Sequence, residues 1–210
     1  MPPETWVLAF DTSAAHCAAA LLSGERVVVL RSEEMAKGQA ERLMPMLEEM
    51  LAEAGIGWRD LWCLGVGTGP GNFTGVRIAV AAARGLALGL GVTAVGVTSL
   101  EAQAFGLGNV VSSLDARRGD LYVQVGAGPA VICGVESLPV IPVGMACVGF
   151  AADEIAARCG GRVVQVAEPA VVAMARIAAV QRGLRGRPAP FYLRGADAAP
   201  PSDPPPVILP

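Results

Sequence analysis

The sequence predicts an α/β protein in which one structural unit occurs twice. The first half contains three successive strands and then a strand, loop, helix and strand, a crossover that makes two strands of a sheet parallel. A strand that ends in aspartate and turns back sharply occurs at Phe10-Asp11 and again at Leu114-Asp115. Two mixed α/β halves that each open on such a hairpin are what a duplicated fold shows in its sequence.

The first half begins with apolar, β-branched runs separated by turn residues, which indicates an antiparallel meander with turns at residues 11–14 and at Ser23-Gly24. A helix follows, because apolar side chains recur at helical spacing. Pro45 lies inside it, so either the helix is kinked there or its regular part begins near Met44. The predicted elements are strands 5–10, 17–22 and 26–32, helix 39–54, strand 61–66, helix 75–90 and strand 92–97.

The second half repeats the opening hairpin and continues with alternating strands and helices. Its predicted elements are strands 109–114 and 120–125 around a turn at 116–119, strand 146–149, helix 151–159, strand 162–166 and helix 170–183. We expect an N-terminal subdomain over residues 1–106 and a C-terminal subdomain over residues 107–195. The tail over residues 196–210 is rich in proline and alanine and is expected to lack regular structure.

Composition restricts the class of protein. Of the 210 residues, 53% are apolar and 17% are charged, which is ample for a well-buried core. The longest apolar region, residues 76–100, contains Arg77 and Arg84 and is broken by glycines, so no membrane span is predicted. The N-terminus lacks the basic segment that opens a secretory signal, and a cytoplasmic location is therefore expected.

Charge and cysteine content argue against two further classes. The formal net charge of −3 disfavours a chain that binds nucleic acid unaided. The five cysteines are widely spaced without a C-x-x-C pair, which indicates buried free thiols rather than disulfides or a zinc site. One stretch without acidic residues is either a solvated helix face with a basic tail or a nucleic-acid contact. It contains Arg176, Arg182, Arg185, Arg187 and Arg194.

A glycine-rich loop, GTGPGNFTGVR at residues 67–77, connects a predicted strand to a predicted helix. It matches neither G-x-x-x-x-G-K-[ST] nor G-x-G-x-x-G, so neither known phosphate-binding mechanism follows from it. Its glycines either serve a tight connection that needs positive φ or permit close approach to an anion or a packed partner. Asn72 or Thr74 is expected to cap the following helix.

Four stretches, spread over nearly the whole chain and in the same order, resemble the bacterial TsaB (YeaZ) family. They are LAFDTS at residues 8–13, GPGNFTGVR at 69–77, LDARRGDLY at 114–122 and YLR at 192–194. The resemblance implies an actin-like ATPase (ribonuclease H-like) fold with mixed sheets flanked by helices. It also implies a complex that installs threonylcarbamoyl on adenosine 37 of tRNAs reading ANN codons. In that complex the TsaB subunit is the non-catalytic partner of TsaD, and the ATPase TsaE is a third component.

In the actin-like superfamily the first hairpin helps to hold a metal-bound nucleotide, which makes six residues candidates for nucleotide binding. They are Asp11, Thr12, Ser13, Gly69, Gly71 and Asp115. The alternative is that Asp11 closes the turn and Ser13 caps a neighbour. Phosphoryl transfer needs cationic clamps, and the single lysine, Lys37, is far from either hairpin in sequence. We therefore expect no catalysis by this chain alone, with ATP or ADP, if any, at the junction with TsaD.

A metal site is not expected. Catalytic relatives hold their metal through two histidines four apart on a helix, whereas the corresponding helix here has none and the single His16 lies in the first hairpin. The chain also departs from the family pattern at Gln39, where histidine is usual, and at Asn72, where serine is usual. Two rival functions remain: a free-standing actin-fold phosphotransferase and a homologue of the metallopeptidases.

The two predicted N-terminal helices carry more apolar surface than one sheet can cover, which predicts a helical interface. The resemblance implies pairing with TsaD or with a second copy of the chain; the alternative is an ordinary contact between the two helices. Arg77 and Arg84, two helical turns apart, are expected at the rim. The predicted centre consists of Leu43, Met46, Leu47, Met50, Val80 and Ala83.

Overall fold

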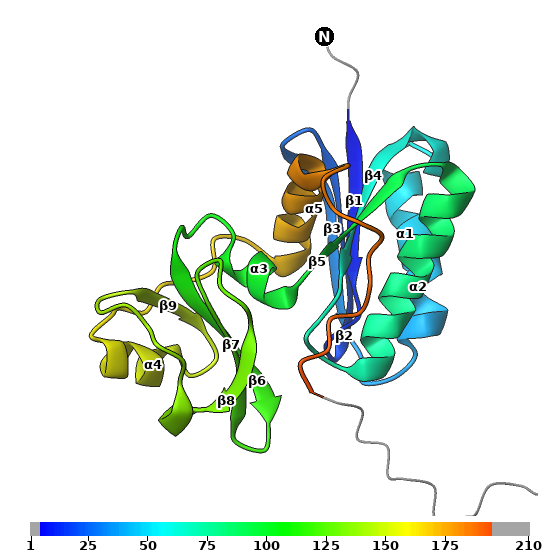
Figure 1. The fold of residues 1–210 in the computed structure, drawn as a ribbon. Helices are drawn as coiled ribbons and strands as arrows, with labels where there is room; N and C mark the ends of the chain where they lie inside the picture. Colours follow the sequence, from blue (N-terminus) through cyan, green and yellow to red (C-terminus); the bar gives the residue numbers. More distant parts are fainter. Residues whose placement is uncertain (1–4, 195–210) are drawn as a thin grey trace, which may run out of the picture.

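In the computed structural model, which describes residues 5–194, the chain forms two mixed β-sheets with helices packed on their faces (Figure 1). The strands are β1 (Trp6–Asp11), β2 (His16–Ser23), β3 (Arg26–Glu34), β4 (Leu61–Gly67), β5 (Thr93–Val97), β6 (Val110–Arg117), β7 (Asp120–Val125), β8 (Val131–Gly134) and β9 (Ala146–Gly149). The helices are α1 (Gln39–Glu53), α2 (Phe73–Leu90), α3 (Ser99–Ala104), α4 (Ala152–Cys159) and α5 (Ala170–Gln181), with 3-10 turns η1 (Trp58–Asp60) and η2 (Val135–Ser137).

The two sheets repeat one topology. Their strand orders are β3-β2-β1-β4-β5 and β8-β7-β6-β9. In the first sheet β2 is antiparallel to β1 and β3, and β4 is parallel to β1. In the second, β7 is antiparallel to β6 and β8, and β9 is parallel to β6. The predicted duplication of a hairpin followed by a parallel crossover is therefore confirmed.

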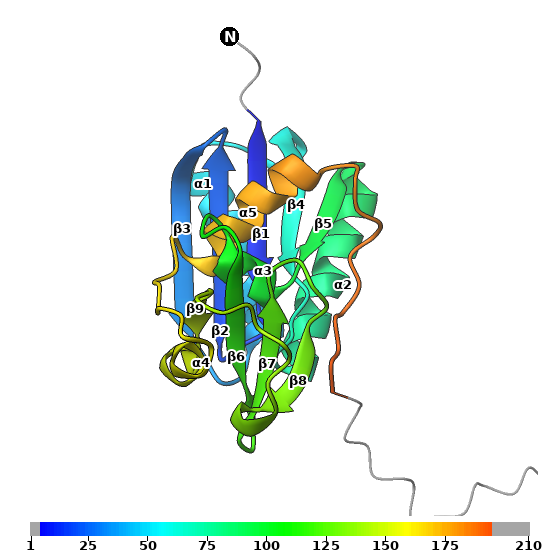
Figure 2. The same ribbon diagram turned by 60° about the vertical axis from the view of Figure 1, so that its left-hand side comes forward.

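The last helix of each half packs on the sheet of the other half. Helix α3 packs against β6 and β9, whereas α5 packs against β4, β1 and β2 (Figure 2). The opposite face of the first sheet is covered by α1 and α2. The predicted subdomain boundary near residue 106 lies between the strands of the two sheets. Because α3 and α5 each pack on the sheet of the other half, the division into two subdomains stays a prediction.

Alternation along β1 supplies two cores. Leu8 and Phe10 belong to the cluster beneath α1 and α2, and Val7 and Ala9 belong to the cluster beneath α5. Each of these four residues is at most 2% exposed. A strand covered by helices on both faces is continuously apolar, which is why residues 6–10 show no polar alternation.

Two local predictions differ from the structure, and two elements were not predicted. Helix α1 is continuous from Gln39 through Pro45, so the alternative in which it begins near Met44 is wrong. The predicted strand at 162–166 does not form: only a bridge between Cys147 and Val163 continues the second sheet, because β9 is only four residues long. Strand β8 and helix α3 were not predicted, although Thr98 and Glu101 form a capping box at the start of α3. The predicted tail over 196–210 lies outside the described residues.

Among the described residues, one helix is long and apolar enough to cross a membrane, judged by length and composition alone. It is α2. No membrane span was predicted here, because Arg77, Arg84 and the glycines interrupt the apolar region. In the structure α2 packs against β4, β5 and β1, and 28% of its residues are buried. The remaining residues leave one side of an apolar helix exposed.

Candidate functional site

Asp11 ends β1 at the tip of the first hairpin and is 4% exposed. Its Oδ1 accepts a hydrogen bond from Ser13 N at 3.1 Å, and its Oδ2 accepts one from Ser13 Oγ at 2.9 Å. His16 Nε2 lies 2.9 Å from the same Oδ2. Both carboxylate oxygens therefore have partners within the hairpin. This arrangement matches the alternative in which Asp11 closes the turn.

The Ser13, Asp11 and His16 side chains do not form a nucleophile-activating triad. In such a triad the imidazole accepts the serine proton and the carboxylate orients the imidazole. Here Ser13 and His16 both bond to Asp11, so no base is in contact with the hydroxyl other than the carboxylate. The hydrogen bond with Asp11 raises the pKa of His16, although burial acts in the opposite direction.

The glycine loop packs directly on the backbone of the first hairpin. Thr12 Oγ1 donates to Gly75 O at 2.6 Å, and Asn72 N donates to Ser13 O at 2.6 Å. A Cβ added to Gly71 would lie 2.3 Å from Ser13 O, and one added to Gly75 would lie 1.8 Å from Thr12 O. These glycines are needed for close approach to the protein's own chain, so the predicted close-packing role of the loop is confirmed.

Of the two caps that the sequence predicts for helix α2, Asn72 or Thr74, the structure has Asn72. Its Oδ1 accepts hydrogen bonds from Thr74 N at 3.0 Å and from Gly75 N at 3.1 Å. This cap occupies two of the N–H groups that would otherwise be available to an anion at the helix N-terminus. Asn72, which stands where the family usually has serine, can therefore still cap the helix.

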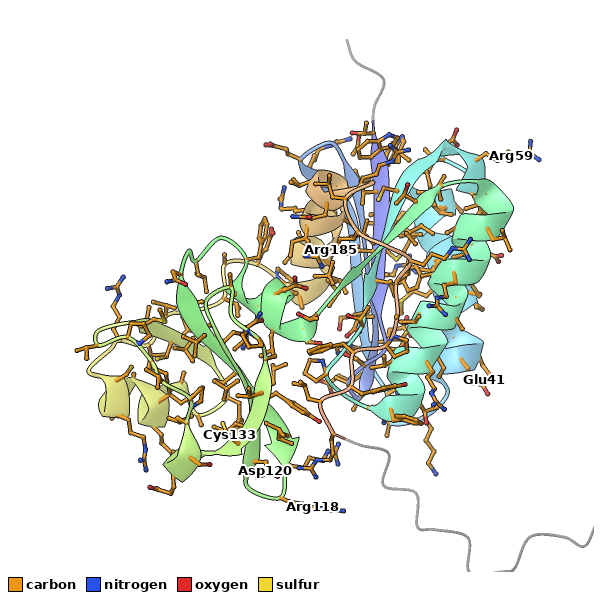
Figure 3. The ribbon with its side chains drawn as sticks, viewed as in Figure 1. Glu41, Arg59, Arg118, Asp120, Cys133 and Arg185 are labelled. Atoms are coloured by element: carbon orange, nitrogen blue, oxygen red, sulfur yellow. The ribbon has the colours of Figure 1, made fainter. Side chains whose placement is uncertain are left out.

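Asp115 lies in the other half, at the tip of the second hairpin, and is exposed. Its Oδ1 accepts from Arg117 N at 2.7 Å. Arg117, Arg118 and Gly119 all have positive φ, at 64°, 56° and 84°. Figure 3 shows Arg118 and Asp120 at this tip. The turn thus presents arginines beside its aspartates.

The six predicted nucleotide-binding residues divide between the two hairpins. Asp11, Thr12, Ser13, Gly69 and Gly71 lie together at the first hairpin and the loop packed on it, whereas Asp115 is at the second. Within residues 5–194 no group of three or more His, Cys, Asp or Glu side chains could hold a metal ion. In the first hairpin the Asp11 carboxylate, the Thr12 hydroxyl and the Ser13 carbonyl oxygen are engaged with the chain itself, and nucleotide binding there stays a prediction.

The predicted centre of the helical interface is wrong. Leu43, Met46, Leu47, Met50, Val80 and Ala83 are each at most 2% exposed and belong to the core under α1 and α2. The sequence could not distinguish the two faces of α2, because small apolar residues surround it almost completely. Arg77 and Arg84 are exposed as predicted, but they contact the C-terminal segment rather than lying free at a rim.

The outward side of α2 is instead formed by Ala81, Gly85, Leu88 and Gly89. Leu88 is 83% exposed. A Cβ added to Gly85 or Gly89 would meet nothing within 4 Å, so no contact within the described residues requires glycine at either position. The neighbouring helix α1 exposes carboxylates, and Figure 3 shows Glu41 pointing away from the protein.

Most of the C-terminal arginines have partners within the protein. Arg176 pairs with Glu168 at 2.9 Å, Arg185 with Glu101 at 2.7 Å and Arg194 with Asp120 at 2.6 Å. Arg182 lies over the Trp62 ring, with Cζ 4.6 Å from the ring centroid. Both predicted interpretations of this stretch are therefore incomplete, because four of its five arginines hold the protein together. The fifth, Arg187, is exposed.

The cysteines are free, and four of the five are buried, as predicted. Burial raises the pKa of Cys17 and of Cys63 to about 11. Buried thiols with raised pKa values are poor nucleophiles. We therefore assign the cysteines to packing.

The chain matches a known protein family over most of its length. A model of the family described as "TsaD: tRNA N6-adenosine threonylcarbamoyltransferase" matches residues 31–181. The chain is 38% identical to the tRNA threonylcarbamoyladenosine biosynthesis protein TsaB of Haemophilus influenzae over 123 residues, which is 55% of this chain and 51% of that one. It is 34% identical to an uncharacterized protein of Mycobacterium tuberculosis over 205 residues, covering 92% and 94% of the two chains.

Among solved structures, YeaZ from Pseudomonas aeruginosa superimposes with a TM-score of 0.72 at 25% identity, covering 90% of this chain and 100% of that one. The duplicated mixed sheets and the exchanged helices place the protein in the class with an actin-like ATPase fold. Within that class, the chain belongs to the family of the matching model and to its TsaB/YeaZ members. The alignments span about half the length of the TsaB relatives.

Proposed function

We propose that the chain is a non-catalytic subunit for synthesis of N6-threonylcarbamoyladenosine at position 37 of bacterial tRNA, acting in the cytoplasm. In this proposal it pairs with TsaD and activates it, and TsaE is the third component. Family membership supports the pathway, because the matching model and the TsaB relatives are both named for threonylcarbamoyl transfer to tRNA. Contact with tRNA is proposed to be indirect, through TsaD.

The observation that carries the pairing is the outward side of α2. Glycine in a helix interior costs about 1 kcal/mol relative to alanine. Gly85 and Gly89 carry this cost, although open space surrounds the position of each missing Cβ. Together with Ala81 they recur every four residues, which is one face of a helix. Close packing of a TsaD helix on this face would account for the glycines, because they let the two helix backbones approach each other.

The same surface supports self-association as a competing state. In a two-fold dimer the outward side of α2 would pack against the same surface of the second copy. We therefore propose that the homodimer and the complex with TsaD use overlapping surfaces and exclude each other.

The non-catalytic role is supported by the first hairpin. Asp11 is the residue that would hold a metal-bound nucleotide, and both of its carboxylate oxygens are hydrogen-bonded to Ser13 or His16. The glycine loop packs directly on the backbone of Thr12 and Ser13, which leaves no room for a ligand on that side of the hairpin. We propose that ATP or ADP, if it binds, does so at the junction with TsaD and not on this chain alone.

The test is reconstitution of the pathway. Modified tRNA is measured with TsaD, TsaE and the enzyme that makes the threonylcarbamoyl adenylate, with and without this chain. We expect modification to require the chain. Full modification in its absence would contradict the proposed function.

Gly85→Leu tests the surface itself. Leucine is a better helix former than glycine and its Cβ would meet no atom within 4 Å, so the monomer should become more stable by up to about 1 kcal/mol. Binding to TsaD should nevertheless be lost, because the side chain blocks close approach. Ala157→Leu, at an exposed position of α4, is the matched control and should bind normally. Undiminished binding by Gly85→Leu would place the interface elsewhere.

A further inference from the structure

The C-terminal segment, residues 182–194, leaves α5 and runs beside α2 over the ends of β4 and β5 (Figure 2). Phe191 N donates to Thr68 O at 2.8 Å, and Arg84 Nε donates to Pro188 O at 2.7 Å. These two bonds hold the segment across the carboxyl ends of two parallel strands. Ligands in α/β sheets commonly bind outside that edge.

A pocket of about 230 Å³ lies beneath the segment. Thr68, Gly96 and Thr98 line it from the strand ends, and Arg185, Arg187 and Phe191 line it from the segment. Pockets for drug-sized ligands are typically about 300–1,000 Å³. This one is smaller, and the Thr68 hydroxyl and the guanidinium groups of Arg185 and Arg187 in its lining suit a small ion rather than a whole nucleotide.

Two of the lining side chains have polar groups without partners. Thr68 is 4% exposed, yet its hydroxyl has no hydrogen-bond partner within residues 5–194. Arg187 has neither a hydrogen bond nor an ion pair in the same part of the chain, although the other arginines of its segment do. The Thr68 hydroxyl is not closed off from solvent and Arg187 is exposed, so both groups are free to bind a ligand in the pocket.

Arg185 adds further donors. Its Nη1 donates to Gly96 O at 2.8 Å and to Glu101 Oε2 at 3.2 Å, and its Nη2 donates to Glu101 Oε1 at 2.7 Å. An arginine has five N–H groups, so two of them, including Nε–H, remain without a partner among the described residues. Because Glu101 neutralises Arg185, the net positive charge of the pocket comes from Arg187.

We propose that this pocket binds a small phosphate anion, with Arg187 as the charged ligand and with Thr68 and Arg185 as hydrogen-bond donors. A hydroxyl and two guanidinium groups from separate parts of the chain suit an oxyanion that accepts from several directions. Inorganic phosphate and the phosphate group of a phosphomonoester share this chemistry. The proposal does not depend on pairing with TsaD.

The test is calorimetric titration of the full chain with inorganic phosphate at low ionic strength, in a buffer without phosphate. We expect saturable binding that Arg187→Gln weakens at least tenfold. Thr68→Val, which removes the hydroxyl at nearly constant shape, should weaken it several-fold. Arg59→Gln removes the same charge from the exposed turn η1, away from Arg185 in Figure 3, and should leave binding unchanged.

Folding is checked by the thermal midpoint of each variant. Arg187→Gln should keep the wild-type midpoint, since Arg187 has no partner in the described chain. AMP serves as the phosphomonoester probe: tighter binding of AMP than of phosphate, lost in Arg187→Gln, assigns the site to a phosphomonoester, and the reverse order assigns it to inorganic phosphate. The proposal is wrong if neither probe binds saturably, or if Arg187→Gln weakens binding no more than Arg59→Gln.

Discussion

Thr12 and Gly75, 63 residues apart in sequence, are in direct contact: Thr12 Oγ1 donates to Gly75 O at 2.6 Å. A Cβ on Gly75 would lie 1.8 Å from Thr12 O, a distance that backbone atoms cannot accommodate without moving. The first turn of α2 is therefore locked against the first hairpin. This contact joins the two family motifs LAFDTS and GPGNFTGVR at one point of the structure.

Gly75→Ala should consequently destabilise the protein by at least about 2 kcal/mol, because overpacking against backbone forces a shift of the helix or the hairpin. Gly85→Ala, in the same helix with open space at Cβ, should stabilise it by up to about 1 kcal/mol. Urea unfolding of both variants measures the difference. Equal stabilities would show that the loop is free to move away from Thr12.

Adjacent positions on α2 should respond oppositely to charge. Val80 is 2% exposed, so Val80→Glu buries an unpaired carboxylate and should cost several kcal/mol, enough to unfold much of the protein. Ala81 is exposed, so Ala81→Glu should remain folded and lose binding to TsaD. Circular dichroism and a pull-down with TsaD report the two properties. A folded Val80→Glu protein would contradict the assignment of that face to the core.

The pH dependence of stability should include a contribution from His16. The hydrogen bond with Asp11 holds the pKa of His16 above its usual value of 6.5. Stability from the protonated imidazole is then fully present below pH 6.5 and is lost as the pH rises through the raised pKa. His16→Gln should therefore lower the free energy of unfolding more at pH 5.5 than at pH 9. A penalty that is equal at both pH values would rule out this coupling.

The purified chain should not hydrolyse ATP above background. Asp11 is engaged with Ser13 and His16, and the single lysine, Lys37, lies between β3 and α1. The assay compares phosphate release by wild type and by Asp11→Ala. A turnover that disappears in Asp11→Ala would favour the rival phosphotransferase over the non-catalytic proposal.

Several features were determined by the sequence itself. The strands around Phe10-Asp11 and Leu114-Asp115, the crossover through α2 and the cap at Asn72 were all predicted, because each depends on neighbours only a few residues away. Helix α3 could also have been predicted from the sequence, since Thr98 and Glu101 form a capping box, which is a local sequence pattern.

Only the tertiary structure decided which face of each helix is buried and which arginines are available. Helix α2 is apolar almost all round, so its side toward the sheet is set by contact with β4 and β5 and not by its own pattern. The predicted strand over 162–166 failed because β9 offers it only a single bridge. Likewise the partners of Arg185 and Arg194 come from Glu101 and Asp120, more than 70 residues away. Pairings over such distances depend on how the two halves pack, which no local pattern of residues encodes.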